Sequence, residues 1–111
     1  MKKMFLLVAV LVFLVNCKES TDEATITAYN NVCASCHGQT GMGDGIAGQA
    51  LEPKPRNFSS GEFKYGNDLA SIKKTIAEGS PGTAMVGYKA QFTDEQITKL
   101  AKYVLSFSQK K

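Results

Sequence analysis

The amino-acid sequence predicts a small all-α protein with one folded domain. Three segments carry apolar residues at helical spacing, and no segment of useful length alternates between apolar and polar residues as a strand does. The chain has 111 residues, 43% hydrophobic and 21% charged, which fits one globular domain and excludes a large multidomain enzyme. A net charge of +3, without a run of five basic residues, argues against nucleic acid as a partner.

The first 16 residues have the pattern of an export signal. Lys2 and Lys3 precede twelve consecutive apolar residues, Met4 to Val15. Twelve helical residues span roughly 18 Å, whereas the hydrocarbon core of a bilayer is about 30 Å thick. A charged start, a short apolar stretch and a polar sequel are typical of a secretory signal peptide. We therefore expect residues 1–16 to be removed on export, with a short uncleaved membrane anchor as the alternative.

Cys17 follows the apolar stretch in the sequence Leu14-Val15-Asn16-Cys17. This sequence resembles the lipobox of bacterial lipoproteins, except that Asn16 stands where Gly, Ala or Ser is usual. The resemblance implies cleavage before Cys17, a lipid on its thiol, and a polar tether over residues 17–24. The alternative is a free or disulfide-bonded cysteine in a secreted protein. The folded domain is then expected over residues 25–108.

The first helix is predicted over Asp22–Cys33 and the second over Asp68–Glu78. Ser20 or Thr21 is the expected N-cap of the first helix, and Asn67 that of the second. Apolar residues three or four positions apart share one face of each helix. They are Ile26, Tyr29, Val32 and Cys33 in the first helix, and Leu69, Ile72 and Ile76 in the second.

The third helix is predicted over Asp94–Phe107 and has the clearest pattern. Thr93 is the expected N-cap, and Gln96 completes a capping box with it. The residues expected to face the core are Ile97, Leu100, Val104 and Phe107. Residues 38–66 are dense in Gly, Pro and Asn and are therefore predicted to form a loop.

The motif with the clearest chemistry is Cys33-Ala34-Ser35-Cys36-His37. C-x-x-C-H is the pattern of c-type haem attachment. Two thiols about one helical turn apart can each add to one of the two vinyl groups of a porphyrin. The adjoining histidine then lies beneath the iron and offers an imidazole nitrogen. The spacing therefore predicts one covalently bound haem c.

Cys33 and Cys36 have three alternative roles. A zinc site needs four ligands, and only these two cysteines and His37 lie close together. A thioredoxin-like redox pair expects a βαβ context, which the sequence does not show. A structural disulfide between Cys33 and Cys36 would close too short a loop to constrain the chain much. Each of these readings is weaker than haem attachment.

The resemblance to a known family extends well beyond the motif. Residues 33–45 read CASCHGQTGMGDG, which closely resembles the C-x-x-C-H-G-x-x-G-x-G-D-G opening of bacterial class I cytochromes c. Residues 79–85, GSPGTAM, look like the loop that carries the methionine ligand in that family, and residues 92–104 look like its C-terminal helix. The resemblance covers residues 25–107. It implies the class I cytochrome c fold, with three to four helices wrapped around one covalently bound haem c.

The resemblance also implies a ligand set. Cys33 and Cys36 would bind the haem, and His37 and Met85 would be the two axial ligands of its iron. The chain has one histidine, so ligation by two histidines within it is impossible. Met42, five residues after His37, is expected on the histidine side and so is the poorer candidate. The alternative for Met85 is an ordinary core methionine.

Several neighbouring residues have expected supporting roles. A backbone carbonyl among residues 46–55 is expected to accept the Nδ1 proton of His37. Arg56, the only arginine, is expected either to pair with a haem propionate or to lie solvated at the surface. Glycines that let the backbone turn sharply near the haem are expected at Gly38, Gly41, Gly43 and Gly45.

The sequence is therefore interpreted as an electron carrier and not an enzyme. It is expected to transfer single electrons in a respiratory or related redox chain, on the periplasmic side of a membrane to which lipid on Cys17 anchors it. Its partners are expected to be redox proteins that dock at the haem edge, with no nucleic acid and no small-molecule substrate. Two alternatives stay open: a haem enzyme or gas sensor with a labile Met85, and a fixed subunit of a larger respiratory complex.

Overall fold

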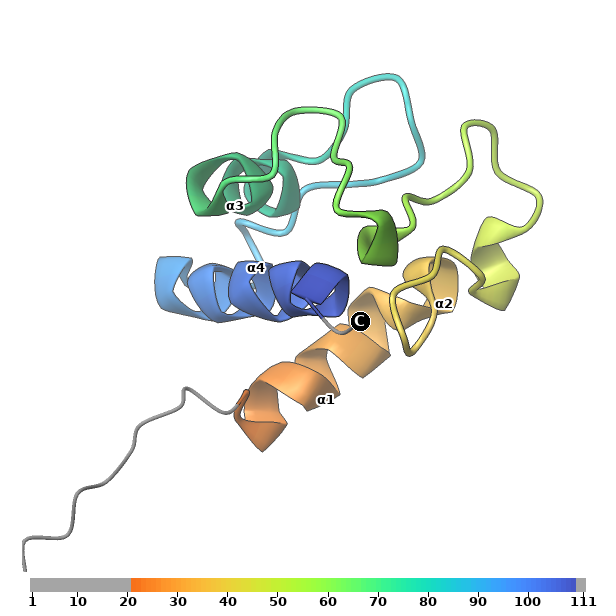
Figure 1. Ribbon diagram of the computed structural model, residues 1–111. Coiled ribbons are helices and arrows are strands. Elements are labelled where there is room, and N and C mark those ends of the chain that lie inside the picture. The colour runs from red at the N-terminus through yellow and green to blue at the C-terminus, as the bar shows by residue number, and fades with distance from the viewer. Residues whose placement is uncertain (1–20, 110–111) are drawn as a thin grey trace, which may run out of the picture.

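The computed structural model describes residues 21–109, so Cys17 and the predicted signal segment lie outside the described residues. Within them no helix is both long and apolar enough to cross a bilayer. Figure 1 shows the arrangement of the helical elements. In chain order these are α1 (Glu23–Val32), α2 (Ala34–His37), η1 (Ile46–Gly48), η2 (Phe58–Ser60), α3 (Leu69–Glu78) and α4 (Asp94–Gln109). The described part has no strand, and the predicted all-α class is confirmed.

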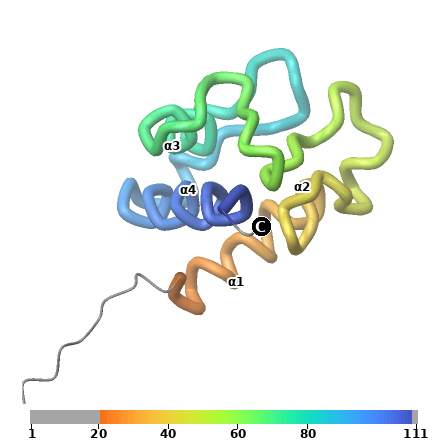
Figure 2. The backbone as a smooth tube through the Cα atoms, in the orientation of Figure 1, coloured from red at the N-terminus to blue at the C-terminus, as the bar shows by residue number. Residues whose placement is uncertain are grey.

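Helix α4 is the centre of the fold because it packs against both α1 and α3. Figure 2 shows that the chain from residue 50 to residue 66 and the chain after α3 lie on the same side of α4, away from α1. Residues 38–66, predicted as loop, contain the short 3₁₀ helices η1 and η2. In the described chain, helices α1 and α4 therefore pack together, and the long loops lie on the side of α4 away from α1.

The helix starts follow the capping chemistry of the residues nearest to them. The predicted capping box of α4 is confirmed, because Thr93 and Gln96 exchange hydrogen bonds between side chain and backbone of 2.8 and 3.2 Å. The other two predicted caps are wrong. Asp22 caps α1 by accepting from the Thr25 N–H at 2.8 Å, and Asp68 caps α3 by accepting from the Ser71 N–H at 3.1 Å. In both cases an aspartate immediately before the first helical residue takes the capping position.

Asp22 also connects α1 to α4. Its Oδ2 accepts a hydrogen bond from Lys99 Nζ at 3.0 Å, and its Oδ1 accepts from the backbone of Thr25. Hydrogen bonds with Thr25 and Lys99 lower the pKa of Asp22 to about 2. The carboxylate therefore stays charged through the neutral range, and the start of α1 is held beside α4.

Tyr29 lies at the crossing of α1 and α4 and is fully buried. Its ring meets Tyr103 edge-on, with centroids 5.1 Å apart, and lies 5.4 Å from the ring of Phe107. Its hydroxyl donates a 2.7 Å hydrogen bond to the carbonyl of Gly38. The crossing of the two long helices is therefore joined directly to the residue that follows His37.

Candidate functional site

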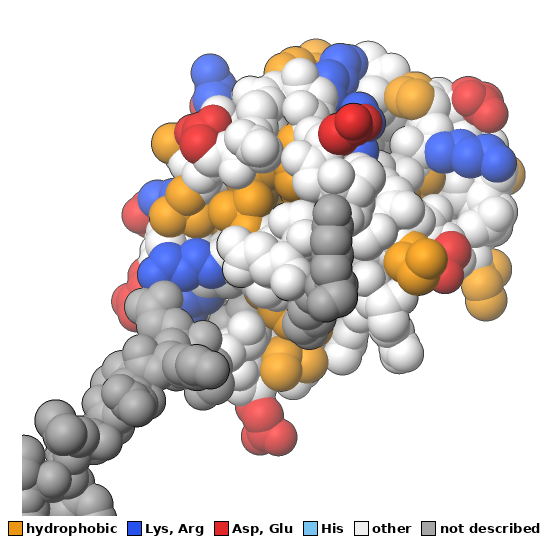
Figure 3. All heavy atoms as spheres, viewed as in Figure 1, with side chains coloured by type: hydrophobic (Ala, Val, Ile, Leu, Met, Phe, Trp, Pro, Cys, Tyr) orange, Lys and Arg blue, Asp and Glu red, His pale blue; other side chains and the backbone are white. Residues whose placement is uncertain are grey.

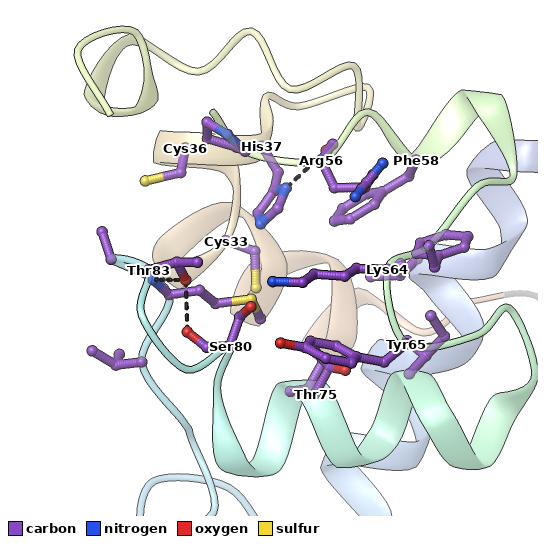
Figure 4. Close-up of a pocket in the computed structure, with 18 of the residues that line it drawn as sticks. Cys33, Cys36, His37, Arg56, Phe58, Lys64, Tyr65, Thr75, Ser80 and Thr83 are labelled. Atoms are coloured by element: carbon purple, nitrogen blue, oxygen red, sulfur yellow. Dashed lines mark hydrogen bonds between the residues drawn. The ribbon is translucent and has the colours of Figure 1, made fainter. Parts of the chain in front are cut away.

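A cavity of about 520 Å³ lies between the end of α1, the loop before α3, helix α3 and the segment after α3. Its wall is mostly apolar and includes Phe58, Phe63, Ile72, Ile76 and Val104. Figure 4 shows part of this wall, with residues from separate segments turned toward one space. All the predicted haem-binding residues line it, and these are Cys33, Cys36, His37 and Met85. The fold thus brings His37 and Met85, which lie 48 positions apart in the sequence, to the same cavity.

The C-x-x-C-H motif forms a separate helical turn. Helix α1 ends at Val32, and α2 begins at Ala34 after Cys33. The His37 N–H donates to the Cys33 carbonyl at 2.9 Å, so Cys33 and Cys36 lie one helical turn apart. Both are free thiols and half-buried. Burial, and to a lesser degree the neighbouring Cys36, raises the pKa of Cys33 to about 11.

The His37 ring is fixed on two sides. It stacks on Phe58 with ring centroids 4.4 Å apart, and its Nδ1 lies 3.1 Å from the carbonyl oxygen of Arg56. This contact suits the tautomer with the proton on Nδ1, which leaves the lone pair on Nε2. Burial lowers the pKa of His37, and the Arg56 carbonyl opposes this shift. A neutral imidazole with a free Nε2 is the form that ligates a metal ion.

The carbonyl that orients His37 belongs to Arg56, so the predicted range of residues 46–55 is wrong by one position. The reason lies in how the loop is held. The Phe58 N–H donates to the Gly41 carbonyl at 2.6 Å, which draws the chain before Phe58 across the histidine ring. The same contact explains why Phe58 stacks on that ring, a role that the sequence did not reveal.

The glycines after the motif serve two purposes. The predicted sharp turns are confirmed at the three glycines with positive φ, which are Gly38, Gly41 and Gly43. Gly45 differs, because its φ is −63° and any residue can adopt it. Its constraint is close approach, since a Cβ there would collide with the backbone of Ser35 in α2. Glycine at position 45 therefore lets the loop return tightly over the motif.

Met85 reaches the cavity from a short segment closed at its base. Gly79, at the end of α3, forms an isolated antiparallel bridge with Val86. The Ser80 N–H donates to the Met85 carbonyl at 3.1 Å just inside this bridge. Met42, in contrast, is 53% exposed and does not line the cavity. Of the two predicted methionine candidates, Met85 is the one at the cavity.

The charged groups at the cavity wall all carry positive charge. Lys54, Arg56 and Lys64 line it, and no carboxylate does. In Figure 4 the Lys64 side chain extends into the space. The wall therefore suits a largely apolar group that carries negative charge at its edge, which is the character of a haem with two propionates.

Sequence reasoning missed a group of hydroxyl-bearing residues at the cavity, namely Tyr65, Thr75, Ser80, Thr83 and Tyr88. The Tyr88 hydroxyl donates to the Val32 carbonyl at 3.4 Å, which links the chain after Met85 to the end of α1. Hydrogen bonds with Ser80 and then Lys64 lower the pKa of Tyr65. These residues lie mostly in loops, where sequence periodicity gives no signal.

Within residues 21–109 no group of three or more His, Cys, Asp and Glu side chains could hold a metal ion, so the zinc alternative gains no support. A small helical domain in which a C-x-x-C-H turn opens onto an apolar cavity is characteristic of c-type cytochromes. Residues 23–104 match the family described as cytochrome c oxidase, cbb3-type, subunit III, and the chain belongs to this family.

Curated relatives and solved structures agree with this assignment. Subunit CcoP of the cbb3-type cytochrome c oxidase of Azospirillum brasilense is 34% identical over 91 residues, which cover 78% of this chain and 30% of CcoP. Cytochrome c55X of Stutzerimonas stutzeri is 33% identical over 76 residues, which cover 66% of this chain and 56% of the relative. The chain thus spans about a third of the length of the CcoP relatives it matches.

Two solved structures show the fold. A chain of the Kuenenia stuttgartiensis reducing HAO-like protein complex Kustc0457/Kustc0458 superposes with a TM-score of 0.66 at 29% identity, covering 79% of this chain and 46% of that chain. The KustC0563 c-type cytochrome superposes with a TM-score of 0.59 at 26% identity, and the match covers 75% of this chain and 95% of that cytochrome. The predicted class I cytochrome c fold is confirmed. Members of the family bind haem c covalently, and the thiols, neutral imidazole and cationic wall described above fit that cofactor.

The base of the Met85 segment should tolerate no side chain at Gly79. Gly79 and Gly82 both have positive φ, which strains alanine at either position, and the ψ of −176° at Gly79 puts that residue in a region almost restricted to glycine, at a cost of about 1–3 kcal/mol for other residues. At Gly79 an added Cβ would also lie 2.7 Å from the Met85 carbonyl oxygen, whereas at Gly82 it would meet nothing within 4 Å. We therefore expect Gly79→Ala to lower the free energy of unfolding of the haem-loaded protein more than Gly82→Ala, as measured by denaturant titration. Equal losses would contradict this account of the segment's base.

Proposed function

We propose that this chain is a monohaem cytochrome c that carries single electrons between protein partners. Cys33 and Cys36 would attach the haem, and His37 and Met85 would be the two protein ligands of its iron. The observation that carries the proposal is that these four side chains, and not Met42, line one cavity. When bound, haem c supplies a one-electron couple between ferrous and ferric iron. The family match supports electron transfer as the function of this domain.

The chain's own residues account for attachment. The thiols of Cys33 and Cys36 would each hold the haem through one of its vinyl groups, with a carbon–sulfur bond formed at one vinyl carbon and the thiol proton passed to the other. Their separation by one helical turn, fixed by the hydrogen bond from the His37 N–H to the Cys33 carbonyl, supports attachment to one porphyrin. His37 is held by Arg56 and Phe58 and directs Nε2 as the ligand atom.

The surroundings favour a relatively high reduction potential. A thioether is a weak donor that stabilises ferrous iron, so ligation by histidine and methionine raises the potential. The apolar wall acts in the same direction, because the oxidised centre carries one more positive charge in a region that excludes water. The chain's single histidine is engaged with the Arg56 carbonyl and offers no second imidazole for acid–base catalysis. We therefore prefer an electron carrier to a haem enzyme.

The partners are proposed to be redox proteins that dock where the cavity opens to the surface. The CcoP relatives are named as subunits of an oxidase, whereas cytochrome c55X is not, so a fixed place in such a complex is the alternative to a free carrier. Figure 3 shows charges of both signs scattered over the face in view, without one dominant patch. Long-range steering is therefore weak on this face, and docking depends on local fit.

The location is proposed to be the periplasmic side of a membrane, with lipid on Cys17 as the anchor. The support comes from the sequence: an export-type apolar stretch ends at Val15, two residues before Cys17, and c-type haem attachment takes place outside the bacterial cytoplasm. Residues 18–22 then lie between the anchor and helix α1, which begins at Glu23, so the predicted tether over residues 17–24 overlaps the first two residues of that helix.

Covalent attachment is tested by haem retention. Two thioethers should keep the haem on the polypeptide through acidified acetone and denaturing gels. Cys36→Ala should leave one thioether and weaken retention, and the Cys33→Ala, Cys36→Ala double variant should lose the haem and be largely unfolded, because the haem fills the cavity at the centre of the domain. Cys17→Ser is the matched control and should keep its haem. A well-folded, haem-free wild-type protein would overturn the proposed function.

Ligation by Met85 is tested by spectroscopy. The oxidised protein should show the weak absorption band at the near-infrared edge that arises from sulfur–Fe(III) ligation, and the reduced protein should bind carbon monoxide poorly. Met85→Ala should abolish the band, admit carbon monoxide and lower the reduction potential. Met42→Ala should change none of these, because its side chain is exposed and away from the cavity. Wild-type protein that binds carbon monoxide readily, together with an unchanged Met85→Ala variant, would favour a haem enzyme or sensor.

The lipid anchor is tested by phase partition. A single acyl chain gives marginal membrane binding, whereas two or more give stable binding. The protein, expressed in a bacterium that processes lipoproteins, should partition into the detergent phase, whereas Cys17→Ser should either be released as a soluble periplasmic protein or keep its uncleaved signal segment, which mass spectrometry distinguishes. Mass spectrometry that finds an unmodified terminus at Cys17 would contradict lipidation.

A further inference from the structure

The backbone of Met85 is held on both sides by residues of its own segment. The Met85 N–H donates to Thr83 Oγ1 at 3.2 Å, and the Met85 carbonyl accepts from the Ser80 N–H at 3.1 Å. Thr83 Oγ1 in turn donates to the Ser80 carbonyl at 2.8 Å. Figure 4 shows Thr83 and Ser80 joined in this way at the cavity. One hydroxyl therefore connects Met85 to the start of the segment.

The rest of the segment offers little support. Residues 80–85 belong to no helix or strand, and the tip at Pro81 and Gly82 is exposed. A Cβ at Gly82 would meet nothing within 4 Å, so no other part of the described chain packs against that point. The Gly79–Val86 bridge closes the base of the segment but leaves the direction of Met85 unset. The Thr83 hydroxyl is the side-chain group that bonds to the backbone of Met85 itself.

We propose that Thr83 is the positioning residue for Met85 and sets how firmly its thioether is held at the iron. This inference rests on the proposed ligation by Met85. Thr83 acts through the backbone: its hydroxyl accepts from the Met85 N–H while it donates to Ser80, which uses both functions of one oxygen. Without that hydroxyl, the Met85 N–H and the Ser80 carbonyl lose a shared partner, and the segment swings more readily away from the cavity.

Three variants separate the hydroxyl from other effects. Thr83→Val keeps the shape of the side chain and deletes the hydroxyl. Thr83→Ser keeps the hydroxyl and deletes the methyl group. Thr98→Val makes the same chemical change at a half-buried position of α4 away from the cavity, where the Thr98 hydroxyl donates within its own helix to the Asp94 carbonyl at 2.9 Å. All three are compared with wild type as haem-loaded proteins at one pH.

The expected results concern the sulfur–iron band and the carbon monoxide reaction. Thr83→Val should shift the equilibrium between Met85-bound and open iron toward the open state by roughly tenfold, which corresponds to about 1.4 kcal/mol and lies within the range for a hydrogen bond. The ferric band should weaken, and the ferrous protein should bind carbon monoxide correspondingly faster. Thr83→Ser should restore both properties to near wild type, and Thr98→Val should leave both unchanged. If Thr83→Val fails to accumulate with haem, Thr83→Ala provides the same deletion without the branched side chain.

The outcomes distinguish this inference from the proposed function. A wild-type protein without the band, or a Met85→Ala variant that keeps it, overturns ligation by Met85 and the role of Thr83 with it. A wild-type band that disappears in Met85→Ala but persists at full strength in Thr83→Val, with carbon monoxide binding unchanged, overturns only the role of Thr83. Loss of the band in Thr83→Ser as severe as in Thr83→Val would show that the methyl group, and not the hydroxyl, supports the segment, and would also overturn the proposal.

Discussion

Tyr29 joins the crossing of α1 and α4 to the haem-attachment motif. Its ring is enclosed by Tyr103 and Phe107 of α4, and its hydroxyl reaches the Gly38 carbonyl, one residue beyond His37. The packing of α1 against α4 therefore supports the motif through the Tyr29 hydroxyl. The loop over residues 38–66 also contacts the motif, because Gly45 lies close to Ser35 and the Arg56 carbonyl lies within hydrogen-bond distance of His37. The histidine side of the cavity is therefore supported by the packing of α1 against α4.

The methionine side is built in a different way. No helix carries Met85, and the segment that does is closed by one bridge and by hydrogen bonds among its own residues. Its connections to the rest of the described chain lie at its two ends. At its start Ser80 shares the cavity wall with Tyr65, whose pKa it lowers, and beyond Met85 the Tyr88 hydroxyl donates to the Val32 carbonyl at the end of α1. The two sides of one cavity therefore differ in stiffness, with packing on one side and local hydrogen bonds on the other.

This difference also explains what could be predicted from the sequence. The three longer helices were predicted because their apolar residues recur at helical spacing, and the motif was recognised because its chemistry requires contiguous residues. The N-caps at Asp22 and Asp68 were missed, since Ser, Thr, Asn and Asp cap almost equally well and several stood near each helix start. The Arg56 carbonyl and the stacking of Phe58 on His37 were not predictable, because they depend on the path of an irregular loop. The hydroxyl groups around Met85 were missed for the same reason.

An electron carrier benefits from a site that changes little between oxidation states, whereas a ligand-binding haem protein needs one position that opens. On the histidine side, the stacking of His37 on Phe58 and the hydrogen bond between His37 and the Arg56 carbonyl would both have to break before the site could rearrange, in addition to the proposed covalent attachment. On the methionine side the loss of a few backbone hydrogen bonds, each worth only about 0.5–1.5 kcal/mol, is enough to turn a site that stays closed into one that opens. The same fold can therefore serve either purpose according to how its methionine segment is braced. In this chain Thr83 and Ser80 hydrogen-bond to each other and to the backbone of Met85. With Met85 as the ligand, the strength of these hydrogen bonds would determine whether the iron stays closed to added ligands.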